Sequence, residues 1–313
     1  MSRDVLVVGA GMAGLTVAAA RVAAGDRVTV IDKGRRHGGR MATRRVDGVA
    51  YDTGVASFAV RGASLRAELA GWIATGDAGP VDGQADHFRG VPSMRALPTA
   101  IAQASGAAVR LATTVTGLRV RDGRWEATVE EGREQPARAT IGADALVITA
   151  PAPQSAALLR SADMGGTPLA APSTLAMLDA VTYAPCLAVL VRPAEDSSAL
   201  PHTVLPHTIL VDAGASAAHF DGDRAAAAAA VAAEASERLG VALVVVHVHG
   251  WRYAQVTSGI DAPALRDDSA GAPLVLAGDL FQVHHDVGDG QHLEGVECAF
   301  LSGRAGAALL GAG

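Results

Sequence analysis

The sequence predicts an α/β fold, with a parallel sheet in a first domain and a second α+β domain built on an antiparallel sheet. Residues 5–8 form a short apolar run of the kind found in buried parallel strands. A glycine-rich turn and an apolar helical stretch over about 12–24 follow directly, and a second strand, RVTVID, ends at residue 32. This order of strand, turn, helix and strand predicts a Rossmann-type domain.

Composition sets the broad class. With 313 residues, half of them hydrophobic, the chain is long enough for a large core and two domains. A net charge of -6 excludes general nucleic-acid binding. Cys186 and Cys298 form no CxxC, so neither a metal site nor a disulfide framework is expected.

No membrane association is expected either. The apolar run at 5–20 is slightly short for a bilayer span, is broken by glycines and lacks a cleavage site. No other run approaches membrane length. Together with the cysteine usage, this predicts a cytoplasmic location.

The glycines of the first turn have the spacing of a dinucleotide site. Gly9, Gly11 and Gly14 form G-x-G-x-x-G between strand and helix, and Asp32 follows eighteen residues after Gly14. Gly9 allows the tight turn, Gly11 lets a pyrophosphate approach the backbone, and Gly14 lets helix and strand pack closely. The helix N-terminus supplies N–H donors, and Asp32 would accept hydrogen bonds from a ribose hydroxyl.

A basic stretch, KGRRHGGRMATRR, follows at residues 33–45. It has six Lys or Arg side chains around a Gly-Gly pair, in a chain that is acidic as a whole. The glycine fingerprint alone is shared by NAD and FAD sites, so the loop after Asp32 has to distinguish them. A nucleic-acid patch is disfavoured by the acidic chain and by the glycines.

Together with other stretches, this loop resembles the renalase-like branch of the FAD-dependent amine oxidase superfamily. The other stretches are AYDTGVASF (50–58), GVPSMRALPTAIA (90–102), VTGLRVRDGRWEATV (115–129), LVITAPAPQSAALL (146–159), WRYA (251–254), LAGD (276–279) and GVECAFLSG (295–303). In this resemblance residues 115–129 form a hairpin and residues 146–159 are expected to form a strand.

The resemblance implies a non-covalent FAD site. Arg40 would clamp the pyrophosphate with its guanidinium fork, and the backbone of Val115 would meet the adenine. Asp279 would accept from a ribityl or ribose hydroxyl, and the helix beginning at Val296 and Glu297 would direct its N–H groups at the flavin. The implied FAD contacts are Gly9, Gly11, Met12, Ala13, Gly14, Asp32, Lys33, Gly39, Arg40, Met41, Val115, Gly278, Asp279, Val296, Glu297 and Ala299.

Catalytic residues are less clearly marked. His284, His285 and His292 lie in the loop between Asp279 and the last helix, where they are expected beside the isoalloxazine and could position substrate or act as acid or base. Arg252, in the WRYA stretch, is the fourth candidate.

Several other side chains have plainer interpretations. Arg35, Arg36, Arg44 and Arg45 are expected mostly in a solvated face. His247 and His249 share one face of a strand; with no third ligand in view, they are core or substrate-facing rather than a metal site. Cys298 stands where relatives carry glycine and is expected to be a small packing residue.

The resemblance also implies the domain organisation of a p-hydroxybenzoate hydroxylase-like two-domain flavoprotein. Residues 1–65, 93–158 and 270–313 would form the FAD-binding Rossmann-type domain. Residues 66–92 and 159–269 would form the substrate domain, with sheet strands over 186–191, 207–212 and 241–248.

The implied activity is that of a flavin oxidase. Hydride would pass from a small reduced substrate to flavin N5, and O2 would reoxidise the flavin; in the renalase-like branch the substrates are dihydro-NAD(P) isomers, restored to NAD(P)+. The alternatives are an oxidase or desaturase of an amine or a hydrophobic biosynthetic intermediate, and a flavin-binding sensor or partner protein without turnover. The segment 207–224 is short and alanine-rich where relatives carry a polar lining, so the substrate could differ from theirs.

Overall fold

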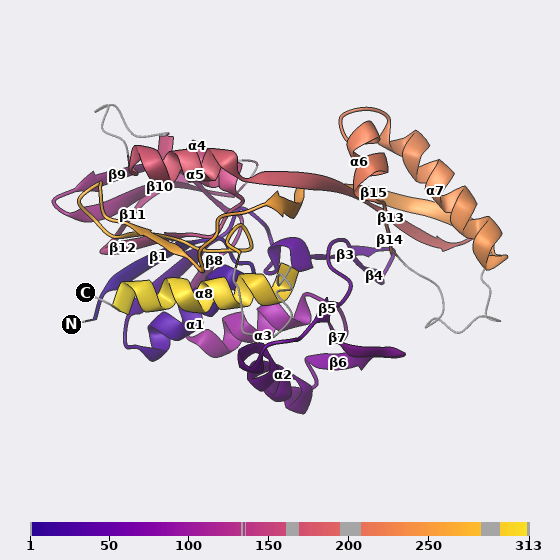
Figure 1. Cartoon of the computed structure of the whole chain (residues 1–313), viewed down its shortest axis with the longest axis horizontal. Coiled ribbons are helices and arrows are strands. Elements are labelled where there is room, and N and C mark those ends of the chain that lie inside the picture. Colours follow the sequence, from indigo (N-terminus) through magenta and orange to yellow (C-terminus); the bar gives the residue numbers. More distant parts are fainter. Residues whose placement is uncertain are drawn as a thin grey trace. The chain divides into compact units, whose positions relative to one another are not determined.

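The computed structural model describes residues 2–132, 134, 136–160, 169–194, 208–282 and 295–311 (Figure 1). The chain forms two compact units. The first unit consists of residues 1–39, 57–182 and 258–313, and the second of residues 40–56 and 183–257.

A six-stranded sheet forms the centre of the first unit. Its order is β16-β17-β12-β1-β2-β8, and all neighbours pair in parallel except β16 and β17. Its strands are β1 (Asp4–Val8), β2 (Arg27–Ile31), β8 (Ala108–Arg110), β12 (Ala145–Ile148), β16 (Leu265–Asp267) and β17 (Leu274–Leu276). The predicted parallel sheet of a Rossmann-type domain is therefore confirmed.

Helices and a second sheet cover the two faces of this sheet (Figure 1). One face carries α1 (Met12–Ala23), α3 (Ala96–Ser105) and α8 (Gly295–Gly311). The other carries the antiparallel strands β9 (Thr113–Arg121), β10 (Arg124–Glu131) and β11 (Ala137–Ala143), with α4 (Ala152–Arg160) and α5 (Pro172–Ala180) beyond them. The hairpin expected at 115–129 is confirmed as β9 and β10.

The strand expected over 146–159 is wrong in its second half. β12 ends at Ile148, and α4 occupies residues 152–160. The first turn of α4 contains Pro153, and the carbonyl of Pro151 accepts from Ser155 N at 3.0 Å. Proline is tolerated in a first helical turn because the amide that it lacks has no partner there.

A smaller layer completes the first unit. It consists of β5 (Phe58–Ala59), α2 (Ala63–Thr75), β6 (Ala78–Val81) and β7 (Gln84–Gly90). These strands form their own sheet, of order β5-β7-β6. The predicted domain division put 66–92 in the substrate domain; by contacts these residues lie in the first unit, and the assignment of a cofactor and a substrate domain stays a prediction.

The second unit is built on a three-stranded sheet of order β14-β13-β15. Its elements are the hairpin β3 (Thr43–Val46) and β4 (Val49–Asp52), then β13 (Thr182–Pro193), β14 (Thr208–Leu210), α6 (Ala213–His219), α7 (Arg224–Leu239) and β15 (Leu243–Ser258). A short 3-10 turn, η1 (Gly39–Met41), precedes the hairpin.

Side chains of β13 alternate between the two faces of this sheet, and each face is covered by a different element. Leu187, Val189 and Val191 pack against Ala227 and Ala228 of α7. The intervening residues, Ala188 and Leu190, pack against Tyr51 of the hairpin. Both faces of β13 are thus apolar because both are covered.

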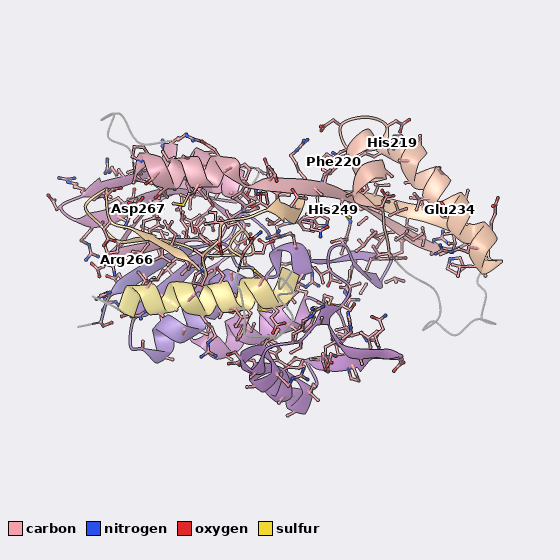
Figure 2. The ribbon with its side chains drawn as sticks, in the orientation of Figure 1. His219, Phe220, Glu234, His249, Arg266 and Asp267 are labelled. Carbon is pink, nitrogen blue, oxygen red and sulfur yellow. The ribbon has the colours of Figure 1, made fainter. Side chains whose placement is uncertain are left out.

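Asp267, a buried carboxylate labelled in Figure 2, stabilises the first unit. It accepts from Ala171 N at 2.8 Å, at the N-terminus of α5, and from Ser269 N at 2.9 Å. Burial alone would raise the pKa of Asp267, but hydrogen bonds from Ser269, Thr174 and these amides outweigh it and lower the pKa.

We expect Asp267→Asn to lower the free energy of unfolding by about 1–2 kcal/mol at neutral pH. A lowered folded-state pKa stabilises the protein above the unfolded-state value of about 4, and this contribution is lost as the pH falls through the folded-state pKa. Urea unfolding of both proteins across acidic pH should therefore show a difference that shrinks toward low pH. Asp268→Asn, at a half-exposed neighbour paired with Arg266, is the control and should change stability little. A difference independent of pH would contradict this role.

Candidate functional site

The first and third glycines of the turn are required by the packing of the first unit. Gly9 has a φ of +117°, and a Cβ there would lie 2.4 Å from Oγ1 of Thr149. A Cβ at Gly14 would lie 2.0 Å from the carbonyl oxygen of Gly9. Both distances are far below contact, so α1 can approach the end of β1 only because these residues lack side chains.

Gly11 differs from the other two glycines. Its backbone is extended, with φ -87° and ψ -175°, and a Cβ there would meet no atom within 4 Å. Gly11 is also the N-cap of α1, and no side chain caps this helix end. Open space beside uncapped N–H groups at the positive end of a helix fits the pyrophosphate of a dinucleotide.

Asp32 is held at this turn. Its carboxylate accepts from Ala10 N at 2.7 Å and from Gly34 N at 2.6 Å, and its own amide donates to Arg110 O at 3.0 Å. The acid at the end of β2 therefore lies beside the glycine turn, where a ribose hydroxyl donor is expected. Its neighbour Lys33 is exposed and donates to Oε1 of Gln154 at 3.3 Å.

The Gly-Gly pair of the basic stretch lies against the same turn. Gly38 N donates to Ala10 O at 2.9 Å. Gly39 has a φ of +53°, and a Cβ there would lie 3.6 Å from Cα of Gly11. The backbone of the stretch thus approaches the glycine turn, and the approach depends on small residues.

Arg40 lies at the start of the second unit. One guanidinium nitrogen, Nη1, donates to the carbonyls of Tyr253 at 3.3 Å and Ala254 at 3.4 Å. A Cβ at Gly54 would lie 1.8 Å from the carbonyl oxygen of Arg40, so Gly54 lets the chain pass close behind Arg40. Met41, next in sequence, is buried. The clamp role of Arg40 stays a prediction.

The start of α8 contains a contact that sequence reasoning missed. The side chain of Glu297 is 2 % exposed and accepts from Arg61 N at 2.9 Å and Gly62 N at 2.7 Å. It therefore ties α8 to the N-terminus of α2. No local pattern signals this contact, because the partners are backbone amides more than two hundred residues away.

The other predicted FAD contacts lie at ends of elements in the first unit. Gly278, with a φ of +135°, follows β17 and donates to Oγ of Ser302 at 2.9 Å, and Asp279 comes next. Val115 lies on β9, paired with Val129. Val296 and Ala299 lie in the first turns of α8. Their contacts with FAD stay predictions.

Of the four predicted catalytic residues, the described part of the chain includes Arg252. His284, His285 and His292 lie outside the described residues. Arg252, on β15, forms an ion pair with Asp221, and its guanidinium lies 4.8 Å from the ring centroid of Phe220. A catalytic role for any of the four stays a prediction.

A row of rings lies on β15 in the second unit. It comprises His247, His249, Trp251 and Tyr253, which we call the β15 row. The ring centroids of His247 and His249 are 6.5 Å apart, and the ring of Trp251 lies edge-on to His249 at 4.5 Å. Burial lowers the pKa of both histidines, and the positive charge of Arg44 lowers both further. Within the described ranges, no three His, Cys, Asp or Glu residues gather as metal ligands would.

Cys298 behaves as a packing residue. It is buried, and its Sγ donates to the carbonyl of Phe281 at 2.8 Å.

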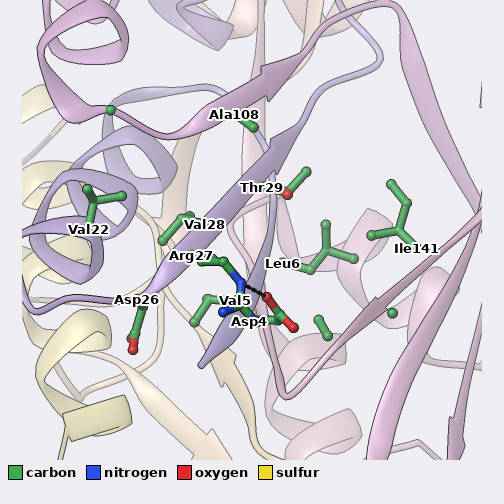
Figure 3. Close-up of a pocket in the computed structure, with 13 residues that line it drawn as sticks. Asp4, Val5, Leu6, Val22, Asp26, Arg27, Val28, Thr29, Ala108 and Ile141 are labelled. Atoms are coloured by element: carbon green, nitrogen blue, oxygen red, sulfur yellow. Dashed lines mark hydrogen bonds and ion pairs between the residues drawn. The ribbon is translucent and has the colours of Figure 1, made fainter. Parts of the chain in front are cut away.

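A cavity of about 410 Å³ lies in the first unit at the opposite end of the parallel strands (Figure 3). Its polar edge includes Asp4 and Arg27, the first residues of β1 and β2, which are joined by a 2.7 Å ion pair. Ligands of open parallel sheets bind at the carboxyl ends of the strands, so this cavity is separate from the glycine turn.

In the described segments, no helix is both long and apolar enough to span a bilayer.

Two family models match consecutive parts of the chain. Residues 7–78 match an NAD(P)-binding Rossmann-like domain, and residues 82–197 match the flavin containing amine oxidoreductases. The first match covers the glycine turn, Asp32 and the basic stretch. The second includes the β9–β10 hairpin.

Solved structures of similar fold cover nearly the whole chain. A candidate protoporphyrinogen oxidase from Exiguobacterium sp. 255-15 has a TM-score of 0.66 at 14% identity, covering 99% of both chains. A triple mutant of putrescine oxidase, redesigned in cofactor binding, has a TM-score of 0.65 at 13% identity, also covering 99% of both. A fatty acid isomerase from P. acnes has a TM-score of 0.60 at 11% identity, covering 98% of this chain and 97% of the other.

At these identities the structural matches show the fold alone, and the cofactor is indicated by the family model together with the open glycine turn. The chain is therefore an FAD-dependent oxidoreductase with a Rossmann-type fold, and its residues 82–197 are similar to the flavin containing amine oxidoreductases.

Proposed function

We propose that this protein is a flavin oxidase that oxidises a small reduced molecule, with dihydro-NAD(P) isomers as the substrate class and O2 as the electron acceptor. The main observation in support of a flavin oxidoreductase is the turn at Gly11. This turn has open space, no side chain caps the helix that follows it, and the carboxylate of Asp32 lies beside it. The substrate class rests on the sequence resemblance to renalase-like proteins.

The chain's own residues have binding and orienting tasks in this proposal. FAD, when bound, supplies the hydride acceptor at flavin N5. The N–H groups at the start of α1 would hold the pyrophosphate and Asp32 would hold a ribose. The guanidinium of Arg40 would bind phosphate oxygens. The amides at the start of α8 would stabilise negative charge on the reduced cofactor.

The lysine content supports a reduced nicotinamide over an amine. Lys33 is the only lysine in the sequence, and it is exposed beside Gln154. Monoamine-oxidase relatives place a lysine near flavin N5, and this chain has none to place there. Hydride removal from a dihydronicotinamide requires no side-chain base, because the product is the nicotinamide cation and the substrate loses no proton.

Anaerobic mixing of the oxidised holoprotein with candidate reductants tests the proposal. We expect 2- and 6-dihydronicotinamide dinucleotides to bleach the flavin faster than ordinary NADH, and primary amines such as putrescine to leave it oxidised. Admission of O2 should restore the oxidised spectrum and give hydrogen peroxide. Bleaching by amines alone would replace this substrate class with amine oxidation, and a flavin that no reductant bleaches would favour a binding protein without turnover.

A further inference from the structure

The register of the β3–β4 hairpin places the side chain of Arg44 on the hairpin face that is turned toward the β14-β13-β15 sheet. Directly opposed residues of an antiparallel pair share a face. Thr43 is opposed to Asp52 and donates to its Oδ1 at 2.6 Å, so these two share one face. Arg44 is opposed to Tyr51, which is buried against Ala188 and Leu190 of β13. The side chain of Arg44 therefore projects from the hairpin face that packs on the sheet.

The β15 row projects toward that same hairpin. A Cβ at Gly250 would lie 3.2 Å from the ring of Phe220, and Arg252 lies over the same ring, so these positions face the α6–α7 layer. Successive side chains of a strand alternate, so His249 and Trp251 point the other way. Nε1 of Trp251 donates to the carbonyl of Thr53, just after β4, at 2.5 Å. Figure 2 shows Phe220 and His249 on opposite sides of the sheet.

Arg44, His247 and His249 thus lie on one side of the second unit. Arg44 and Arg224 add positive charge around His249, Arg44 does so around His247, and no carboxylate is among the groups that act on either imidazole. Across the described residues, Arg44 makes no ion pair. Burial and this positive charge lower the pKa of both imidazoles and so favour the neutral ring, which has one N–H donor.

We propose that Arg44, His247 and His249 form a subsite for an anionic group, a phosphate or a carboxylate, of the substrate. The guanidinium of Arg44 offers only N–H donors, each neutral imidazole can turn its one N–H toward an anion, and the positive charge of Arg44 disfavours a metal ion or an ammonium group. The edge-on ring of Trp251 holds His249 in place. The inference rests on the proposed function and deepens it, because it selects phosphorylated or carboxylated substrates over cationic amines.

Histidine ring signals in the NMR spectrum of the holoprotein test the subsite directly, with inorganic phosphate and acetate as probes. The signals are assigned with His247→Gln and His249→Gln. We expect phosphate to shift both signals, more strongly as the pH falls, because a bound anion favours the protonated ring. If acetate shifts the two histidine signals and phosphate does not, the subsite binds a carboxylate. Arg44→Gln should weaken binding about tenfold, which corresponds to about 1.4 kcal/mol.

Arg45→Gln is the matched control. Arg45 is the next residue on β3, lies on the opposite hairpin face, and donates to the carbonyl of Gly48 at 3.0 Å. It should leave the anion affinity unchanged. Ring signals that neither probe moves, or equal losses in the two arginine variants, would overturn the subsite. Flavin bleaching is measured separately. If the protein binds phosphate at this subsite but dihydronicotinamides do not reduce its flavin, the proposed function is wrong and the subsite stands.

Discussion

Gly11→Val should weaken FAD binding strongly while leaving the protein folded. The extended backbone of Gly11 suits any residue, and a Cβ there meets no protein atom within 4 Å, so the apoprotein can accommodate valine. The same side chain would fill the space beside the N–H groups of α1 that the pyrophosphate needs. We expect FAD affinity to fall about 100-fold or more, or about 3 kcal/mol, measured by fluorescence titration of apoprotein.

Gly71→Val provides the control for this experiment. Gly71 is an exposed residue of α2, and a Cβ there also meets nothing within 4 Å, so a side chain at this position has space. FAD affinity should stay at the wild-type value, and circular dichroism should show both variants folded. A folded Gly11→Val protein that binds FAD normally would show that the cofactor does not approach this turn.

Glu297→Ala should cause the largest loss of stability among single side-chain truncations at the site. The buried carboxylate satisfies the amides of Arg61 and Gly62, and its removal leaves two donors without their acceptor and a small cavity. Unsatisfied buried donors and lost charge-assisted hydrogen bonds together correspond to about 3 kcal/mol. Urea unfolding with FAD at the same saturating concentration in both proteins measures this loss.

Glu234→Ala is the comparison variant for Glu297. Glu234 is an exposed glutamate of α7, and its removal should change the free energy of unfolding by less than about 0.5 kcal/mol. Equal stability of the Glu297→Ala and wild-type proteins would show that the tie between α8 and α2 is not needed.

Local patterns in the sequence were enough to predict the cofactor end of the first unit. The spacing of Gly9, Gly11 and Gly14, the strand before them and the acid at residue 32 each depend on neighbours close in sequence, so each leaves a readable signal. The structure adds the reason for each glycine. Two of them avoid clashes with the protein itself, and only Gly11 leaves space for a ligand.

Contacts between distant segments could not be predicted in the same way. The sequence predicts a role for Glu297 only through the backbone N–H groups of its helix, which would face the flavin. The structure adds a role for the side chain, which accepts hydrogen bonds from the backbone amides of Arg61 and Gly62. Arg44 is exposed, as the sequence predicts, but only the register with Tyr51 shows which face of the hairpin carries its side chain. Backbone amides carry no sequence signature, and strand register depends on pairing, so neither is encoded in a short motif.

The flavin content of the purified protein tests the central claim most directly. We predict the absorbance spectrum of bound FAD, release of FAD rather than FMN on denaturation, and recovery of the spectrum when apoprotein is mixed with FAD. Protein that is purified without flavin, and whose folded apoprotein takes up no FAD, would contradict the account.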